Sequence, residues 1–156
     1  MDLRRLRAGE WIVGAAGFLL LVSLFLSWYD GQSGWESLGI LDVILAFVAL
    51  NAVAIPFVTA SYRAPALPLA HQSLTVLIGS VALLLVVGRV LNIPDWADGR
   101  EGGLWVGLLA TLGVVAGGML AMRDERRSPP GEHTDLTGVP VPGPPQIETL
   151  PAPRRE

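Results

Sequence analysis

The sequence predicts an all-α membrane protein, a four-transmembrane-helix bundle followed by a disordered, Pro-rich C-terminal tail. Three observations support this prediction. Hydrophobic residues make up 51% of the 156 residues, and they gather in four long runs that are almost free of charge. The charged residues fall in the short segments between these runs. A helix needs about 20 predominantly apolar residues to cross the hydrocarbon core of a bilayer.

Four windows of the sequence meet this length. They are residues 11–28, 38–60, 69–91 and 102–122, within a transmembrane domain over residues 11–127 that follows a basic cytoplasmic N-terminus, residues 1–10. The first and fourth windows are uncharged. The second carries one charge, Asp42, near its start, and the third carries one, Arg89, near its end.

The first window has a competing interpretation as a cleaved signal peptide, because basic residues precede it and a polar segment follows it. Its apolar run is long for the middle region of a signal peptide. Residues 27–30, Ser-Trp-Tyr-Asp, lack a small-x-small cleavage site. A retained first helix is therefore favoured.

The arginines predict the orientation. The segments before the first window, between the second and third, and after the fourth contain Arg4, Arg5, Arg7, Arg63, Arg123, Arg126 and Arg127. The other two connections are mostly acidic. By the positive-inside rule the Arg-rich flanks are cytoplasmic, so both termini are expected in the cytoplasm. All 11 basic residues are Arg in an Ala-, Gly- and Pro-rich chain, which is typical of a high-GC bacterium and indicates a bacterial cell membrane.

Aromatic residues lie near the ends of the windows. The predicted outer ends carry Trp28, Tyr29, Trp35, Trp96 and Trp105. Such rings favour the headgroup level of a bilayer, so we expect them to form an interfacial belt.

The composition changes from residue 128 onward. Eight prolines and few apolar residues over residues 128–156 predict a disordered cytoplasmic tail. Residues 139–145 favour polyproline II geometry, which leaves open a docking site for a proline-binding partner. A flexible tail without a dedicated reader is the preferred interpretation.

Asp42 and Arg89 are the most informative pair inside the predicted membrane. The second and third windows are antiparallel neighbours, and both charges lie near the outer side at matching depth. Charges in hydrocarbon usually face the bundle and pair with each other, so we expect an Asp42–Arg89 ion pair that joins the two helices. The alternatives are a relay or ligand site reached from outside, and an Arg89 side chain that extends to the surface.

Asn51 and Pro56 lie deeper in the second window. Pro56 frees a backbone carbonyl one turn earlier, and Asn51 is able to hydrogen-bond to a neighbouring helix. This pair is typical of helix packing and, less often, of a binding cavity. His71, at the cytoplasmic start of the third window, is expected to be solvated.

Small residues dominate the fourth window. Spacings of four place Gly103 with Gly107, and Gly113 with Gly117, on shared faces where two backbones can approach closely. Packing within the monomer is the first expectation. A membrane-protein partner or a homo-oligomer held through this helix is the alternative.

Catalytic and cofactor motifs are missing from the sequence. It contains no His-Glu-x-x-His, no Gly-x-Ser-x-Gly and no phosphate-binding loop. It has no cysteine and only two histidines, which are far apart. We therefore expect no enzyme, no cofactor, no metal and no nucleic-acid partner.

Six short motifs, in this order and spacing, carry a family resemblance. They are residues 26–29 (Leu-Ser-Trp-Tyr), 34–36 (Gly-Trp-Glu), 41–43 (Leu-Asp-Val), 89–94 (Arg-Val-Leu-Asn-Ile-Pro), 103–105 (Gly-Leu-Trp) and 122–125 (Met-Arg-Asp-Glu). Over residues 8–127 the chain resembles small four-span membrane proteins that are numerous in actinobacterial genomes. The resemblance implies location and topology and brings no activity.

Two functions of different class follow from these features. The first is a non-enzymatic scaffold or accessory subunit that contacts a partner through the fourth helix or the aromatic outer loops. The second is a small-molecule or ion transporter that uses Asp42, Asn51 and Arg89. A cavity that reaches Asn51 would favour transport, and a solid bundle would favour the scaffold.

Overall fold

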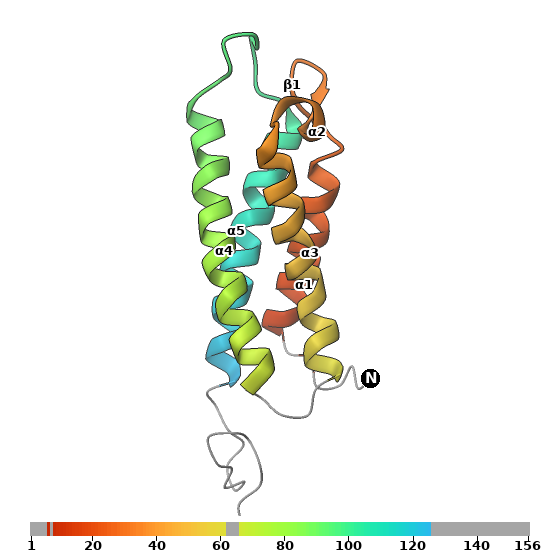
Figure 1. The fold of residues 1–156 in the computed structure, drawn as a ribbon, viewed down its shortest axis with the longest axis vertical. Coiled ribbons are helices and arrows are strands. Elements are labelled where there is room, and N and C mark those ends of the chain that lie inside the picture. The colour runs from red at the N-terminus through yellow and green to blue at the C-terminus, as the bar shows by residue number, and fades with distance from the viewer. Residues whose placement is uncertain (1–5, 7, 62–65, 126–156) are drawn as a thin grey trace, which may run out of the picture.

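The computed structural model describes residue 6, residues 8–61 and residues 66–125, which form a mostly helical, elongated bundle (Figure 1). Its elements are α1 Ala8–Ser23, β1 Ser27–Tyr29, β2 Gln32–Ser33, α2 Gly34–Ser37, α3 Ile40–Ser61, α4 Ala66–Leu91 and α5 Gly102–Glu125. The two strands, α2 and the loop between α4 and α5 lie together at one end, called here the hairpin end. The end where α1 begins and α5 finishes is called the opposite end.

Three of the described helices are long and apolar enough to cross a membrane: α3, α5 and residues 71–91 of α4. Helix α1 is apolar as well, but it contains 16 residues. At about 1.5 Å per residue it extends about 24 Å, somewhat less than the roughly 30 Å of a hydrocarbon core. The structure is therefore compatible with a membrane protein, and α1 alone falls short of a full span.

The first helix was expected to reach Trp28 and ends instead at Ser23. The Ser23 carbonyl accepts a hydrogen bond from the Leu26 N–H at 3.1 Å and another from the Trp28 Nε1 at 2.7 Å. A terminal carbonyl that has lost its helical partner is thus satisfied locally. The chain then continues through turns into β1.

A β-hairpin follows α1, which the purely helical expectation did not include. Strands β1 and β2 pair antiparallel, with Tyr29 opposite Gln32. The two residues between them, Asp30 and Gly31, both have positive φ, 43° and 79°. An Asp-Gly pair with two positive φ angles matches the tight turns whose twist suits a hairpin.

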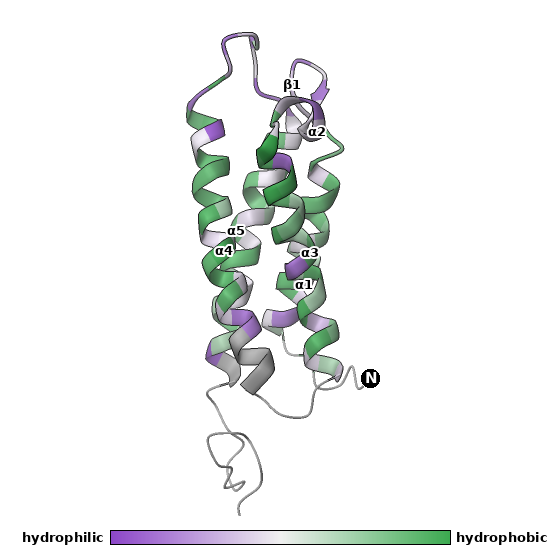
Figure 2. Ribbon diagram, in the orientation of Figure 1, coloured by the Kyte–Doolittle hydropathy of each residue, from purple (hydrophilic) through white to green (hydrophobic). Residues whose placement is uncertain are grey.

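The helices pack as a ring in which α1 contacts both α3 and α5, and α4 contacts both α5 and α3. The α1–α5 contact is the most extensive, and the α3–α4 contact is the loosest of the four. The largest buried side chains are Trp28, Tyr29, Leu20, Leu24, Leu45, Ile55 and Leu104. In Figure 2 the helices are largely hydrophobic along their length, and hydrophilic residues concentrate in the hairpin-end loops and near the opposite end.

The tail expected over residues 128–156 lies outside the described residues, as do Arg4, Arg5, Arg7 and Arg63.

Candidate functional site

Four glycines of α5, at positions 103, 107, 113 and 117, face α1 and β1 within the same chain. A Cβ added at Gly113 would lie 2.9 Å from the Ala16 Cβ, and one at Gly117 would lie 2.9 Å from the Val13 backbone nitrogen. These approaches are closer than real Cβ atoms make, so glycine is needed for the two backbones to come this near.

The same arrangement continues toward the hairpin end. A Cβ at Gly103 would lie 2.6 Å from the Ser27 carbonyl oxygen, and one at Gly107 would lie 2.7 Å from the Trp28 ring. All four glycines singled out by the sequence are therefore occupied by packing inside the monomer. A homo-oligomer held through α5 would have to use a face of this helix other than the one that carries these four glycines.

Trp28 is the centre of this packing and was misplaced by the sequence interpretation. Its side chain is 0% exposed, as is that of Tyr29, so neither ring belongs to an interfacial belt. Trp35, Trp96 and Trp105 are 37%, 50% and 48% exposed, which fits that role better. The position of an aromatic residue along a helix predicts its depth in a membrane. Packing alone decides whether its ring points into the bundle or outward.

The hairpin end is held together by hydrogen bonds between segments distant in sequence. The Gly31 N–H donates to the Glu101 Oε1 at 2.7 Å, and the Asp98 N–H donates to the Asp30 Oδ2 at 2.7 Å. The Glu101 N–H also donates to the Trp28 carbonyl at 2.9 Å. The loop between α4 and α5 is thus joined to the hairpin by one carboxylate from each side, Glu101 of the loop and Asp30 of the hairpin.

Two ionisable groups of this end have pKa values shifted in opposite directions. Burial raises the pKa of Tyr29, and the charges of Arg89 and Arg100 partly oppose that rise. Hydrogen bonds from the backbone and side chain of Ser33 lower the pKa of Glu36. Ser33 and Glu36 form a capping box on α2.

Asp42 and Arg89 lie near the hairpin end of α3 and α4, but no ion pair within 4 Å joins them in the described part of the chain. The Asp42 carboxylate accepts from the Val43 N–H, and the Arg89 Nη2 donates to the Leu38 carbonyl at 3.5 Å. Leu38 precedes α3 by two residues, so the guanidinium extends beyond the depth of Asp42. The Arg89 side chain therefore contacts a backbone carbonyl of the segment before α3.

Each charge has a favourable place on its own helix. Asp42 lies in the first turn of α3, and Arg89 lies in the last turn of α4. An acid at a helix N-terminus and a base at a C-terminus are both stabilised by the helix dipole. The positions of both residues are explained without a bond between them.

Pro56 does not end α3, which is continuous from Ile40 to Ser61. Its ring packs on α1, because a Cβ added at Gly14 would lie 2.6 Å from the Pro56 Cγ. Asn51, half-buried in the same helix, donates from its Nδ2 to the Phe47 carbonyl at 3.5 Å. Its backbone oxygen lies 3.4 Å from the Nε2 of His71 on α4. His71 is therefore half-buried in a contact between helices.

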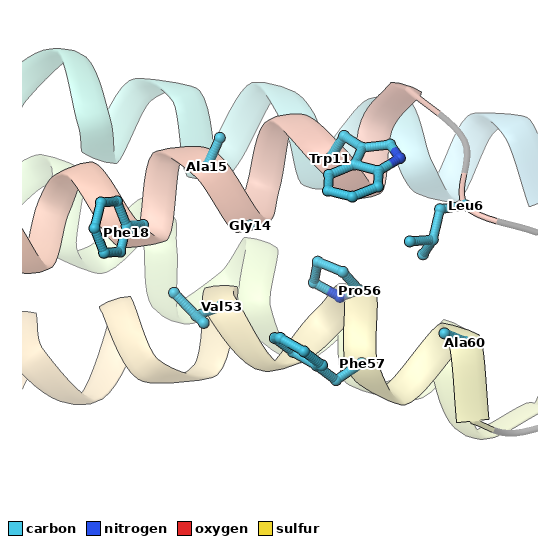
Figure 3. Close-up of a pocket in the computed structure, with 9 residues that line it drawn as sticks. All are labelled: Leu6, Trp11, Gly14, Ala15, Phe18, Val53, Pro56, Phe57 and Ala60. Atoms are coloured by element: carbon cyan, nitrogen blue, oxygen red, sulfur yellow. The ribbon is translucent and has the colours of Figure 1, made fainter. Parts of the chain in front are cut away.

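A cavity of about 310 Å³ lies beside Pro56 between α1 and α3 (Figure 3). Trp11 and Phe18 line it from α1, and Val53, Pro56 and Phe57 line it from α3. Its remaining lining residues are also apolar, and Asn51 is not among them. The cavity offers space to an apolar chain and no polar group to orient it.

Buried polar residues near the opposite end escaped the sequence interpretation. Glu10 on α1 is 2% exposed, and Gln72 on α4 is 0% exposed. A Cβ at Gly118 of α5 would lie 2.5 Å from Val76 and 4.0 Å from Val13, so three helices converge there. Glu10 and Gln72 are one turn further toward the opposite end on those same faces. The signal was a polar run at residues 71–73 inside the third window.

Among the described residues, no three His, Cys, Asp or Glu side chains group closely enough to hold a metal ion. Comparison with known proteins adds no identity, because no family model, curated protein or solved structure matches the chain.

Proposed function

We propose that the chain is an integral membrane protein of a bacterial cell membrane, crosses it four times and keeps both termini in the cytoplasm. Support for the fourth span comes from the pairing of α1 with α5. Close approaches run from Gly9 against Ala121 to Trp28 against Gly103. Residues 103–121 of α5 extend about 27 Å at 1.5 Å per residue, so the segment over residues 9–28 accompanies α5 across most of a hydrocarbon core.

The extended strand β1, Ser27–Tyr29, supports the same proposal. An extended residue advances about 3.3 Å, roughly twice the rise of a helical one. Residues 27 and 28 therefore add to the reach of the first segment beyond the turns at residues 24–26. The 16-residue length of α1 understates the depth that its segment covers.

We further propose that the protein is a non-enzymatic scaffold or accessory subunit whose partner binds at the hairpin end. The observation that carries this proposal is the cross-linked surface there, where Gly31, Glu101, Asp98 and Asp30 join two loops through short hydrogen bonds. A preorganised surface loses little conformational freedom on binding. Trp96, half-exposed on that surface, is the side chain best placed to contact a partner.

Purification in a mild detergent, with mass spectrometry of the proteins that co-purify, tests this proposal. A stoichiometric partner should be retained by wild type and lost by Trp96→Ser. Trp11→Ser is the matched control, because Trp11 is 54% exposed at the opposite end against 50% for Trp96. A lone monomer, or a partner that both variants retain equally, would contradict a partner site at the hairpin end.

Transport by Asp42, Asn51 and Arg89 is the second candidate, favoured by one observation. Arg89 lines a cavity of about 380 Å³ between α3 and α4. Asp42 and Asn51 do not line it, so a continuous path would need a further conformation. Reconstituted vesicles that release a trapped ion only with wild-type protein, and not with Asn51→Leu, would support transport over the scaffold.

A further inference from the structure

The cavity between α3 and α4 near the hairpin end is a site that helix packing leaves open. It encloses about 380 Å³ where these two helices contact each other most loosely. Four aliphatic side chains form most of its wall, together with Gly88, Arg89 and Asn92. Arg89 carries the only charge among these lining residues.

We propose that this cavity binds an anionic phospholipid of the leaflet at the hairpin end. The phosphate contacts the Arg89 guanidinium, and an acyl chain lies along the aliphatic wall. This inference rests on the proposed insertion of the protein in a membrane. It commits to a membrane lipid as the occupant.

The charge of Arg89 is the first argument. A guanidinium has five N–H donors, and within the described residues that of Arg89 makes one long hydrogen bond, 3.5 Å from its Nη2 to the Leu38 carbonyl. Asp42 does not line the cavity, and its carboxylate accepts from Val43. A half-buried cation near the end of a membrane helix favours an anionic neighbour, in addition to the support that it takes from the helix dipole. Phosphate matches it, because the guanidinium fork binds phosphate oxygens in a bidentate manner.

The shape of the cavity is the second argument. Gly88 leaves space beside the guanidinium, since a Cβ added there would meet no atom within 4 Å. Ile40 is 82% exposed and Leu85 is 38% exposed, so the aliphatic wall opens on the side where a bilayer would lie. An acyl chain can therefore enter laterally while its headgroup stays at the end of the helices.

The position of Arg89 is the third argument. The Tyr29 hydroxyl donates to the Arg89 carbonyl at 2.6 Å and holds the end of α4 against the hairpin. Asn92, the next polar residue, donates its amide to the Gly88 carbonyl at 3.1 Å and also lines the cavity. The backbone that carries the guanidinium is thus fixed, which reduces the entropy lost on binding a headgroup.

Native mass spectrometry of the full-length, delipidated protein in detergent tests the proposal. Dioleoylphosphatidylglycerol is the anionic probe, and dioleoylphosphatidylcholine is the zwitterionic comparison. Wild type should bind the anionic lipid more tightly, and Arg89→Gln should lose affinity for it by about tenfold, the effect of losing one charge-assisted hydrogen bond. Arg123→Gln, which removes an Arg from the opposite end, should bind as wild type does.

A second variant tests the space in the cavity separately from the charge of Arg89 and from a loss of folding. Gly88→Leu keeps Arg89 and fills the space beside it, and it should also lower the affinity for the anionic lipid by about tenfold. Soluble glycerophosphate should not displace the lipid, because it lacks the acyl chain. Unchanged binding by either Arg89→Gln or Gly88→Leu overturns the proposal. So does an equal loss in Arg123→Gln, or displacement by glycerophosphate at the concentration of the lipid.

Membrane insertion is measured separately, by retention of the protein in carbonate-washed membranes. Retention of wild type and variants, combined with loss of lipid preference in Arg89→Gln and Gly88→Leu, supports the inference. Retention without any lipid preference in wild type refutes the lipid site and leaves the membrane protein standing. Release of wild type by carbonate refutes both.

Discussion

Replacement of Gly117 by Ala tests whether α5 packs on α1 inside the monomer. A Cβ at Gly117 would lie 2.8 Å from the Ile12 Cγ2 and 2.9 Å from the Val13 backbone nitrogen. A side chain can rotate away from such a contact, but the Val13 backbone moves only with α1. Overpacking of this kind costs about 1–3 kcal/mol, from which the better helix propensity of Ala subtracts about 1 kcal/mol. We expect Gly117→Ala to lower the free energy of unfolding by about 1 kcal/mol.

Gly88→Ala is the matched control on α4. A Cβ there would meet no atom within 4 Å, so only the propensity gain of about 1 kcal/mol remains. The two variants should differ by about 2 kcal/mol, a factor of about 30 in the unfolding equilibrium constant. The assay is unfolding of the detergent-solubilised protein by a denaturing detergent, followed by circular dichroism.

Equal stability of the two variants would refute close packing of α1 on α5 at this level. Sedimentation of both variants in detergent adds an independent reading. If Gly117→Ala converts an oligomer into a monomer without loss of monomer stability, the glycine face lies between chains and the packing described above is wrong.

Three further predictions concern the hairpin end. Trp28→Phe keeps a ring on Gly107 but removes the Nε1 hydrogen bond to the Ser23 carbonyl, which still accepts from the Leu26 N–H. The variant should therefore lower the free energy of unfolding by about 0.5–1.5 kcal/mol in the same assay, and an unchanged value would contradict that bond. In a Tyr62→Phe background, Tyr29 should ionise above its ordinary pKa of 10.0 in a spectrophotometric titration, because burial disfavours the phenolate. Because the pKa of Tyr29 is higher in the folded state, the neutral phenol contributes its full stability below the unfolded pKa, and this contribution is lost as pH rises through the folded pKa. Alkaline unfolding should therefore be delayed in Tyr29→Phe, and an unshifted titration of Tyr29 would refute its burial. Asp42→Arg should accumulate poorly in the membrane, and the double swap with Arg89→Asp should not recover wild-type accumulation, because each charge then opposes the dipole of its own helix. Recovery by the double variant would instead support the ion pair predicted from the sequence.

Hydropathy predicted the long helices, whose formation depends on the local sequence and not on which neighbour they pack against. The long apolar runs around Val48, Ala82 and Val114 gave α3, α4 and α5, because any such run forms a helix in which backbone groups are satisfied internally. The spacing of Gly113 and Gly117 also predicted a face for close packing. It could not say which helix would fill that face, since this depends on the partner surface.

The hairpin was missed although its signal was present. Asp30-Gly31 is flanked by strand-forming Trp28 and Tyr29, which together favour a two-residue turn. The predicted first span ends at Trp28 and leaves Tyr29 in the connection that follows, so the purely helical prediction contains no strand there. Glu10 was missed for a different reason, because its burial depends on three helices converging near Gly118.

The direction of the Arg89 side chain could not be predicted from the sequence either. Equal depth along two helices predicted a bond to Asp42. The length of an Arg side chain lets the guanidinium reach the Leu38 carbonyl instead, closer to the helix ends. The position of a charged residue in the sequence predicts where its Cα lies along the helix. Local packing decides where the charged group at the end of its side chain lies.

The sidedness of the chain tests the central claim, a membrane domain of four spans that includes α1. The protein has no cysteine, so single cysteines at residue 2, residue 32, residue 98 and residue 128 can each be labelled by a membrane-impermeant maleimide in intact cells. Four spans predict labelling from outside at residues 32 and 98, and at residues 2 and 128 only after the membrane is broken. If α1 does not cross, residues 2 and 32 will label on the same side of the membrane, and the four-span account is wrong.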